Sequence, residues 1–491
     1  DYVYVVEDGR AKREYVTVLE ISDDQVLVEG TKAGEKIMVE KTYRLIRKIY
    51  YLCFLGLCVV LPFKAALSQG LTLISDAETE SYLAKVIQPL FKAAGINFNP
   101  NNIFIVNDNS LNAFVSDGNY LFVNTGTLLS IDDTNELAGI LAHETGHILG
   151  GHIVRQKLKM EQMQYVMLGS MLAAGAAAVS TGRGDAAMAV ILGSQSSALN
   201  SMLNYQMEEE RNADESAVKL LAKTQQSTDG LKRFMRKIKK QNALSGIEES
   251  NYFRTHPMTT ERISHFNEAA KNNNFSKINS LDANLTMIKA KLTAFLLDIA
   301  KVKRMYPATK NDVPARYAHA ILDFRQGNIK AALAEIETLL KQQPNNPYFY
   351  ELKGQFLFES GQVAASISTY EKALEMLPNS PILKTSLAHA ILENSPSKQQ
   401  AQKAANLLQQ SLISVPSSTS WQLLARAYDI CGQPASSYYA AAEFNYAIGN
   451  LDGAQKQVAR AKKSQPTKSV LLKLEDLDER IKTELKERKN L

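Results

Sequence analysis

The feature that most constrains the fold is a repeated spacing in the C-terminal part of the chain. Residues 344–347 (PNNP) and 378–381 (PNSP) begin 34 residues apart. Gly354, Tyr370 and Ala373 lie between them at helical spacing. A period of this length predicts pairs of antiparallel helices, each too small to bury its apolar face alone. The pairs must stack on one another, so this region cannot form one ordinary globular core.

This period is that of tetratricopeptide repeats. A fourth unit begins near Trp421, and a fifth contains Ala442 and Gly449. We expect a helical linker, the repeats and a charged capping helix over residues 271–316, 317–467 and 468–491, respectively. The groove of the stacked pairs is the expected binding site for protein partners.

The composition limits the remaining possibilities. A chain of 491 residues is too long for one core, so several domains are expected. The formal net charge of +5 is small and spread along the chain, which argues against a nucleic-acid partner. Two of the three cysteines, Cys53 and Cys58, lie in an apolar run, so no disulfide framework is predicted.

That apolar run, residues 49–63, is typical of an export signal. Lys41, Arg44, Arg47 and Lys48 precede it, and small residues follow. It is shorter than the roughly 20 residues that a membrane-spanning helix needs. We therefore predict a signal peptide over residues 41–68, cleaved near its end, and a periplasmic protein. An uncleaved anchor is the alternative.

Residues 1–40 alternate apolar and polar side chains and predict short antiparallel strands. Residues 4–9 (YVVEDG) and 31–36 (TKAGEK) resemble the C-terminal end of a periplasmic adaptor subunit of an efflux pump. A periplasmic segment is inconsistent with the basic residues that follow it, which should stay cytoplasmic. We interpret the segment as a fusion or an over-extended reading frame without a catalytic role.

The region from about residue 76 to 266 mixes helical and strand patterns. Helical spacing covers residues 76–94 and 132–150, a strand is predicted at 102–106, and two apolar runs flank Asp117-Gly118 as in a hairpin. This mixture predicts an α+β domain, which we place at residues 69–270.

A candidate metal site lies in residues 143–147 (HETGH) of this region. Residues four apart on a helix share a face, so His143 and His147 point to the same place while Glu144 stands beside them. This is the HExxH pattern of zinc peptidases. Zinc would lower the pKa of a bound water, and Glu144 would take its proton during attack on a peptide carbonyl.

Glu210 and Asp214 supply the carboxylates that such a site still needs. Catalytic zinc takes three protein ligands and leaves one position open. We predict Glu210 as the third ligand, and Asp214, one turn later, as the acceptor of a proton from a ligand imidazole. The prediction is one zinc ion per chain. The neighbouring acids Glu208, Glu209 and Glu215 are interpreted as solvated charge.

Together with residues 255–263 (THPMTTERI), these motifs resemble those of the HtpX and CAAX-prenyl-protease superfamily of zinc peptidases. With the repeats, the chain resembles the periplasmic beta-barrel assembly-enhancing proteases within it, from about Leu71 onward. The resemblance implies a mostly helical zincin-type domain with a small β-sheet, followed by an α-solenoid. It also implies a substrate-binding edge strand at Asn112, Ala113 and Phe114. Residues 117–119 (DGN) depart from the Pro-Gly or Gly-Gly turn of relatives.

The resemblance gives His256 two possible roles. It donates to the oxyanion of the transition state, or it occupies the open position of the metal and keeps the enzyme latent. His152, five residues after His147, is predicted to lie on another helix face with a structural role. Residues 165–203 predict either an amphipathic lid or hairpin that touches a membrane, or helices packed on the core.

The resemblance implies a periplasmic zinc endopeptidase that degrades misassembled outer-membrane proteins and assists their assembly. Its partners would be unfolded or stalled outer-membrane proteins and their assembly machinery, bound through the repeats. One alternative is a membrane-anchored HtpX-like stress protease, held by residues 49–63 and 166–203. The other is a non-proteolytic chaperone or scaffold with structural zinc.

Overall fold

The computed structural model divides the chain into two units, residues 1–71 and 72–491. It describes residues 2–7, 10–15, 17–21 and 26–29 of the first unit. It describes residues 72–489 of the second unit, except 117, 182–183, 246–254, 258, 272–274 and 276–278. The export segment predicted at 41–68 therefore lies outside the described residues.

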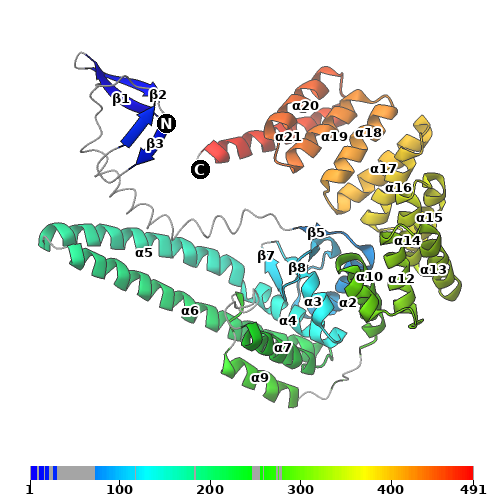
Figure 1. Ribbon diagram of the computed structural model, residues 1–491, viewed down its shortest axis with the longest axis horizontal. Helices are drawn as coiled ribbons and strands as arrows, with labels where there is room; N and C mark the ends of the chain where they lie inside the picture. The colour runs from blue at the N-terminus through cyan, green and yellow to red at the C-terminus, as the bar shows by residue number, and fades with distance from the viewer. Residues whose placement is uncertain are drawn as a thin grey trace. The chain divides into compact units, whose positions relative to one another are not determined.

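The first unit contains short antiparallel strands, in agreement with its alternating pattern. Strand β1 (Tyr2–Glu7) pairs with β2 (Arg10–Tyr15), and β3 (Thr17–Ile21) pairs with β4 (Val26–Glu29). Figure 1 shows these strands in dark blue.

The second unit begins with a small mixed sheet. Its strands are β5 (Leu73–Ile74), β6 (Ile103–Val106), β7 (Ala113–Ser116) and β8 (Tyr120–Asn124), in the order β5-β6-β8-β7. β6 and β8 are parallel, whereas β5 and β7 pair antiparallel with their neighbours. The hairpin predicted around Asp117-Gly118 is thus β7–β8. Its second strand runs directly into the short helix α3 (Thr125–Ser130).

Two helices pack against this sheet and form the core of the catalytic region. Helix α2 (Ala77–Ala94) contacts β6, and α4 (Thr134–Gly150) contacts β7 and α2. Asp133 caps α4 by accepting a hydrogen bond from the Glu136 backbone N–H at 3.0 Å. The short η1 (Pro100–Asn102) leads into β6. Helix α2 has strong apolar periodicity, which explains why the sequence pattern predicted it, whereas α4 is buried on nearly all sides.

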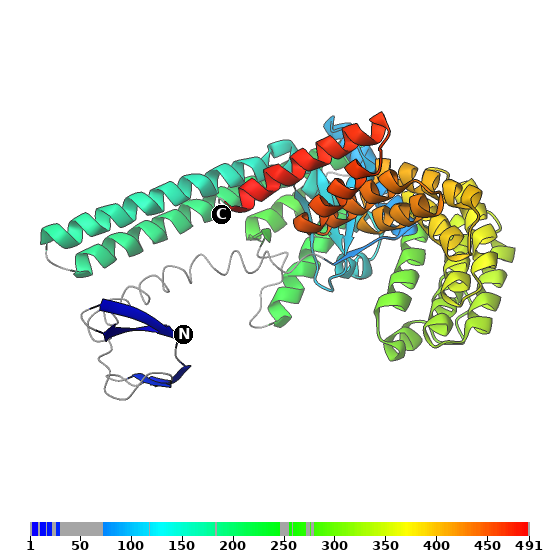
Figure 2. The same ribbon diagram turned by 90° about the horizontal axis from the view of Figure 1, so that it is seen from above.

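The next two helices are unusually long and form an antiparallel pair, α5 (His152–Thr181) and α6 (Gly184–Lys223). Figures 1 and 2 show the pair projecting from α4, with the C-terminal half of α6 returning to the core. Many large apolar side chains of α5 face solvent, including Tyr165, which is 75% exposed, and Leu172, which is 77% exposed. The prediction that helices 165–203 pack on the core is wrong for this part of α5. None of the helices in the described parts of the chain is both long enough and apolar enough to span a membrane.

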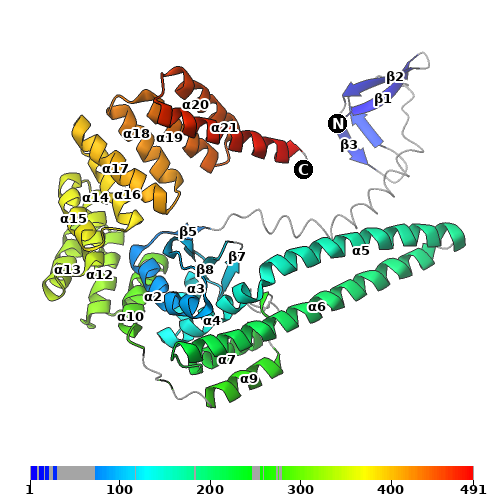
Figure 3. The same ribbon diagram turned by 180° about the vertical axis from the view of Figure 1, so that it is seen from behind.

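The remaining helices complete the core and form the repeats. They are α7 (Asp229–Ser245), α9 (Thr260–Lys271), α10 (Asp282–Leu296) and α11 (Ile299–Met305). The repeat helices are α12 (Val313–Arg325), α13 (Ile329–Gln342), α14 (Pro347–Glu359), α15 (Val363–Met376), α16 (Pro381–Glu393), α17 (Lys398–Ser414), α18 (Ser418–Ile430), α19 (Pro434–Ala447), α20 (Leu451–Lys463) and α21 (Lys468–Lys489). Figure 3 shows these helices following one another as stacked hairpins. The predicted fourth unit begins at Trp421 in α18, and α19 contains Ala442 of the predicted fifth unit.

Helix α10 joins the repeats to the catalytic core. It packs against α2, α3 and the first repeat helix, α12. Its buried Lys291 forms ion pairs with Asp76 and Glu78 at the start of α2, and with Glu351 of α14. A buried lysine is stabilised only when carboxylates surround it, so this cluster ties α2, α10 and α14 together.

Candidate active site

The site starts from α4, which holds His143, Glu144 and His147 in its last turns. All three side chains are buried, and Nε2 of His147 lies 3.1 Å from Nε2 of His143. The two rings meet edge to face, with centroids 4.7 Å apart. The predicted convergence of two imidazoles on one face is therefore present in the structure.

Gly146, inside the same motif, allows α6 to approach α4. A Cβ atom at this position would lie 2.6 Å from the carbonyl oxygen of Ala213. Because any side chain would push the helices apart, glycine is needed for this contact. Ala213 stands between Glu210 and Asp214, so the contact brings both carboxylates to the histidines.

Glu210 and Asp214 contact the imidazoles from opposite sides. Oε2 of Glu210 lies 3.3 Å from Nε2 of His143, and its Oε1 lies 3.2 Å from Nε2 of His147. Asp214 lies on the far side of the first ring, with Oδ1 2.8 Å from Nδ1 of His143. A proton on that Nδ1 leaves the Nε2 lone pair of His143 directed at Glu210 and His147.

This donor set fits a metal ion. Lone pairs on two imidazole nitrogens and a carboxylate repel one another at about 3 Å unless a proton or a metal cation lies among them. Burial by itself would lower the pKa of His143, but the carboxylates of Glu210 and Asp214 raise it to about 10. The surrounding charges thus favour positive charge at this spot. The buried histidine and glutamate cluster therefore implies a metal ion.

His256 joins the cluster from the segment that precedes α9. Its Nδ1 lies 3.0 Å from Oε1 of Glu210 and 3.3 Å from Nε2 of His143. One potential ligand atom from each of His143, His147, Glu210 and His256 lies within 4.8 Å of the others. His256 is therefore buried against the site and not on the surface.

Glu144 lies beside the cluster. Within the part of the chain that the structure describes, its buried Oε1 has no hydrogen-bond partner, and the nearest charged group is Nε2 of His256 at 3.7 Å. Burial raises the pKa of the Glu144 carboxyl, while His256 and His143 oppose that shift. A carboxylate with raised pKa and a free lone pair is suited to accept and return a proton.

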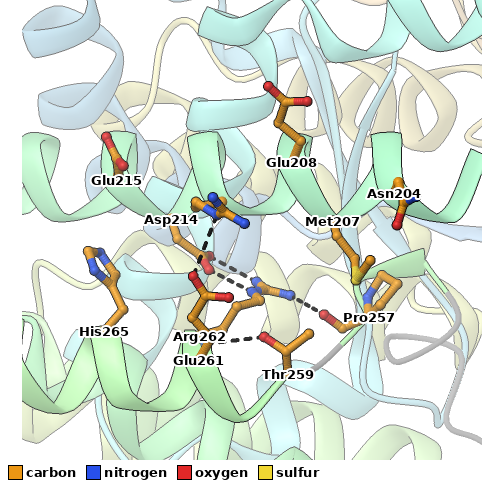
Figure 4. A pocket seen from close by; sticks show the side chains of 11 residues that line it. Asn204, Met207, Glu208, Asp214, Glu215, Pro257, Thr259, Glu261, Arg262 and His265 are labelled. Atoms are coloured by element: carbon orange, nitrogen blue, oxygen red, sulfur yellow. Dashed lines mark hydrogen bonds and ion pairs between the residues drawn. The ribbon is translucent and has the colours of Figure 1, made fainter. Parts of the chain in front are cut away.

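Arg262, on α9, is a site residue to which the sequence assigned no role. Its guanidinium donates to Asp214 at 2.6 and 2.9 Å, and its Nη1 lies 2.8 Å from Oε2 of Glu210. The same group donates to the carbonyl oxygen of Pro257 at 2.7 Å, which Figure 4 shows. Arg262 thus orients two carboxylates and fixes the residue after His256. The motif at residues 255–263 contains Arg262, but no spacing rule gives a role to an arginine contributed by a separate helix.

Two further predictions about single residues are wrong. His152 does not lie on another face of the same helix, because α4 ends at Gly150 and His152 begins α5. Its Nδ1 is 2.8 Å from Nδ1 of His147. Glu209 is buried and pairs with Arg155 at 3.7 Å, whereas Glu208 and Glu215 are exposed as expected.

A surface pocket adjoins the site on the side of Asp214 and Arg262. It lies between α6 and α9, and Figure 4 shows the side chains that line it. Among the described residues that line this pocket, none is His143, His147 or Glu210. The pocket therefore borders Asp214 and Arg262, which support the cluster, and does not open onto the predicted ligand atoms.

The predicted substrate strand lies at the edge of the sheet. Ala113 and Phe114 belong to β7, and Asn112 directly precedes it. Among the strands that the structure describes, β7 pairs with β8 alone, and it contacts α4, the helix that carries the histidines. Ala113 is buried, and Phe114 stacks on Phe122 of β8 with ring centroids 4.8 Å apart.

Buried HExxH histidines, a glutamate from a second helix and a glutamate beside them define a metallopeptidase. Comparisons with known proteins agree: the model of Peptidase family M48 matches residues 77–270, and a Tetratricopeptide repeat model matches residues 317–381. The chain thus carries a peptidase family M48 domain followed by tetratricopeptide repeats, as predicted.

Individual relatives agree with this assignment. The Beta-barrel assembly-enhancing protease of Yersinia pestis is 24% identical over 72% of this chain and 73% of its own length. The protein of the same name from Escherichia coli K12 is 22% identical over 78% of both chains. A tetratricopeptide-repeat structure from Thermus thermophilus is 18% identical and covers 34% of this chain and 95% of its own, with a TM-score of 0.22, too low to carry an argument. The predicted distant homology to the beta-barrel assembly-enhancing proteases is confirmed.

Proposed function

We propose that the protein is a zinc-dependent endopeptidase in which His143, His147 and Glu210 bind the metal. The observation that carries the proposal is the convergence of their ligand atoms, with Glu144 beside them. Tetrahedral zinc with bonds of about 2.0–2.1 Å separates its ligand atoms by about 3.3 Å. The observed separations of 3.1 to 3.3 Å match that requirement.

Each remaining group has a role in this proposal. When bound, zinc polarises a peptide carbonyl and makes water more acidic. Glu144 accepts the proton of the attacking water and passes it to the leaving amine. Asp214 holds the proton on Nδ1 of His143, and Arg262 keeps Asp214 and Glu210 in place. An extended substrate would pair with the edge strand β7, at residues 112–114.

For His256 we favour the latent role. A histidine that only donates to an oxyanion needs to face the substrate carbonyl. Here its Nδ1 is instead as close to Glu210 and His143 as the predicted ligands are to one another. It therefore occupies the position that water and a substrate carbonyl require.

We further propose a periplasmic role in which the enzyme acts on unfolded or stalled outer-membrane proteins. Two kinds of observation support it: the names of the relatives and the repeat array. Stacked repeats present an extended groove for protein partners, so they are suited to hold a substrate or the assembly machinery. A folded β-barrel has no unpaired strand that could add to β7, whereas an unfolded outer-membrane protein can present an extended segment to it.

The substrate proposal predicts cleavage that depends on the folding state. The purified protein, with and without His256→Ala, is incubated with one outer-membrane β-barrel protein, either unfolded by dilution from urea or folded in detergent. We expect fragments from the unfolded form only, measured by gel and mass spectrometry, and none with a zinc chelator. Equal cleavage of both forms, or cleavage of casein together with no cleavage of the unfolded barrel protein, contradicts the proposed substrate class.

We also propose peripheral membrane contact through the α5–α6 pair, within residues 165–203. A helix whose exposed faces are apolar is usually covered by protein or lipid, and Val166, Leu168 and Leu172 are all exposed. The exposed, basic Lys157 precedes this apolar stretch on α5, where anionic headgroups would meet it.

This contact predicts binding to anionic vesicles. The double variant Val166→Ser and Leu172→Ser should lose most of the flotation with phosphatidylglycerol vesicles. Ile413→Ser removes an equally exposed apolar side chain from α17 and serves as the matched control. Flotation that survives the double variant, or that falls equally in the control, excludes this surface.

A further inference from the structure

The junction between α4 and α5 brings His152 back against His147. Helix α4 ends at Gly150, and Gly151 takes a left-handed conformation with φ of 61°. Its backbone N–H bonds the carbonyl oxygens of His147 and Ile148. Residues other than glycine rarely adopt this conformation. The turn makes His152 the first residue of α5 and reverses the direction in which its side chain points.

Gly150 leaves the space that the His152 ring occupies. A Cβ atom at position 150 would lie 2.0 Å from Nε2 of His152 and 2.3 Å from its Cδ2. No side chain fits there while the ring is in place. The two glycines therefore determine where the ring lies: one turns the chain and the other makes room.

The ring contacts a predicted metal ligand. Nδ1 of His152 lies 2.8 Å from Nδ1 of His147, and the rings meet edge to face with centroids 4.9 Å apart. His152 is only 3% exposed, so water does not compete for this contact. At this distance one ring nitrogen carries a hydrogen and donates it to the lone pair of the other.

The metal cluster decides which nitrogen carries that hydrogen. Nε2 of His147 faces Nε2 of His143 and Oε1 of Glu210 at 3.1 and 3.2 Å. To bind a cation there, Nε2 must carry a lone pair, and a neutral imidazole then has its hydrogen on Nδ1. His147 is thus the donor and His152 the acceptor.

We propose that His152 is a positioning residue: its Nδ1 accepts the Nδ1 hydrogen of His147 and holds His147 in the tautomer and ring orientation that bind the metal. This inference rests on the proposed function. The two histidine ligands then have unlike supports. His143 donates to the carboxylate of Asp214, whereas His147 donates to a neutral ring. A neutral ring is a weaker hydrogen-bond acceptor than a carboxylate and raises the basicity of its donor less, so His147 is the weaker base of the two.

The test compares variants of the purified full chain that keep or remove the acceptor. In His152→Asn, the side-chain oxygen takes the place of Nδ1 as acceptor, whereas His152→Leu has none. Zinc affinity is measured by competition with a chromophoric chelator. We expect His152→Leu to bind zinc about 10- to 100-fold more weakly, the usual effect of losing such a partner, and His152→Asn to stay within a few-fold of wild type.

A second readout follows the hydrogen itself. In zinc-loaded protein labelled with ¹⁵N-histidine, the Nδ1–H signal of His147 should exchange slowly with water in wild type and His152→Asn, and rapidly in His152→Leu. Gly150→Ala, which displaces the ring, should weaken zinc binding in wild type but not in the His152→Asn background. Thermal unfolding of each metal-free variant checks that the fold is kept.

The outcomes separate this proposal from the proposed function. If wild type does not bind zinc, or if Glu210→Gln binds it equally well, the ligand set is wrong. If Glu210→Gln loses zinc while His152→Leu keeps wild-type affinity and a slowly exchanging Nδ1–H, the role of His152 is overturned. Equal weakening in His152→Asn and His152→Leu also overturns it, because the ring would then act through packing alone.

Discussion

Replacing Glu144 with glutamine should leave metal binding intact and lower peptide cleavage by about 10²- to 10⁴-fold, the usual effect of losing a general base. Glu144 contributes no atom to the four-residue ligand cluster, so its replacement should not lower the affinity for the metal. An amide keeps the size of the side chain but cannot accept a proton from water. Initial rates on fluorescent casein, with zinc content measured on the same samples, check both parts.

Glu208→Gln is the matched control for this change. Glu208 is an exposed acid on α6, near the site but outside the cluster. Its replacement should change neither the zinc content nor the rate of cleavage. Cleavage by Glu144→Gln at near wild-type speed would remove Glu144 from the reaction. Loss of zinc in Glu144→Gln would instead make it part of the ligand support.

Replacing His256 with alanine should raise basal cleavage of unfolded protein. In the latent role that we propose, its imidazole, with Nδ1 close to Glu210 and His143, occupies the position that a substrate carbonyl and water would use. If His256 leaves the metal accessible in about a tenth of the resting molecules, its removal should raise the cleavage rate about 10-fold. The measurement is the casein rate of His256→Ala against wild type at equal zinc content.

His265→Ala is the control, since His265 is an exposed histidine on α9 that lines the neighbouring pocket. It should leave the rate unchanged. A fall of about 10²-fold in His256→Ala would assign His256 to the oxyanion instead, because that is the usual loss when one such donor is removed. Equal rates in His256→Ala and wild type would exclude both roles.

Much of the site could be predicted because helical geometry is local. Spacing of four residues places His143 with His147, and Glu210 with Asp214, on shared faces whatever the rest of the chain does. The repeat period of 34 residues similarly predicts helix pairs, since each pair closes through its own turn. The need of catalytic zinc for a third protein ligand then connected the two helices, because only Glu210 and Asp214 offered carboxylates at matching spacing.

His152 was misplaced because its position depends on a break in the helix. Continued helical spacing from His147 would carry residue 152 to another face, as predicted. Gly150 and Gly151 instead end α4, and the left-handed turn brings the ring back. Two adjacent glycines are a sequence signal for a helix end, but the contact of His152 with His147 follows only from the turn that they form.

By itself, the sequence determined the types of ligand, their pairing along each helix and the repeat architecture, because these follow from short-range spacing. Apart from Asp214, only the tertiary structure decided which side chains support the ligands. Arg262 reaches Asp214 and Glu210 from a separate helix, and His256 enters the cluster from a loop. The α4–α6 approach depends on the contact of Gly146 with Ala213, which are far apart in the chain. Such contacts depend on packing between distant segments, and no local pattern encodes the distance between two helices.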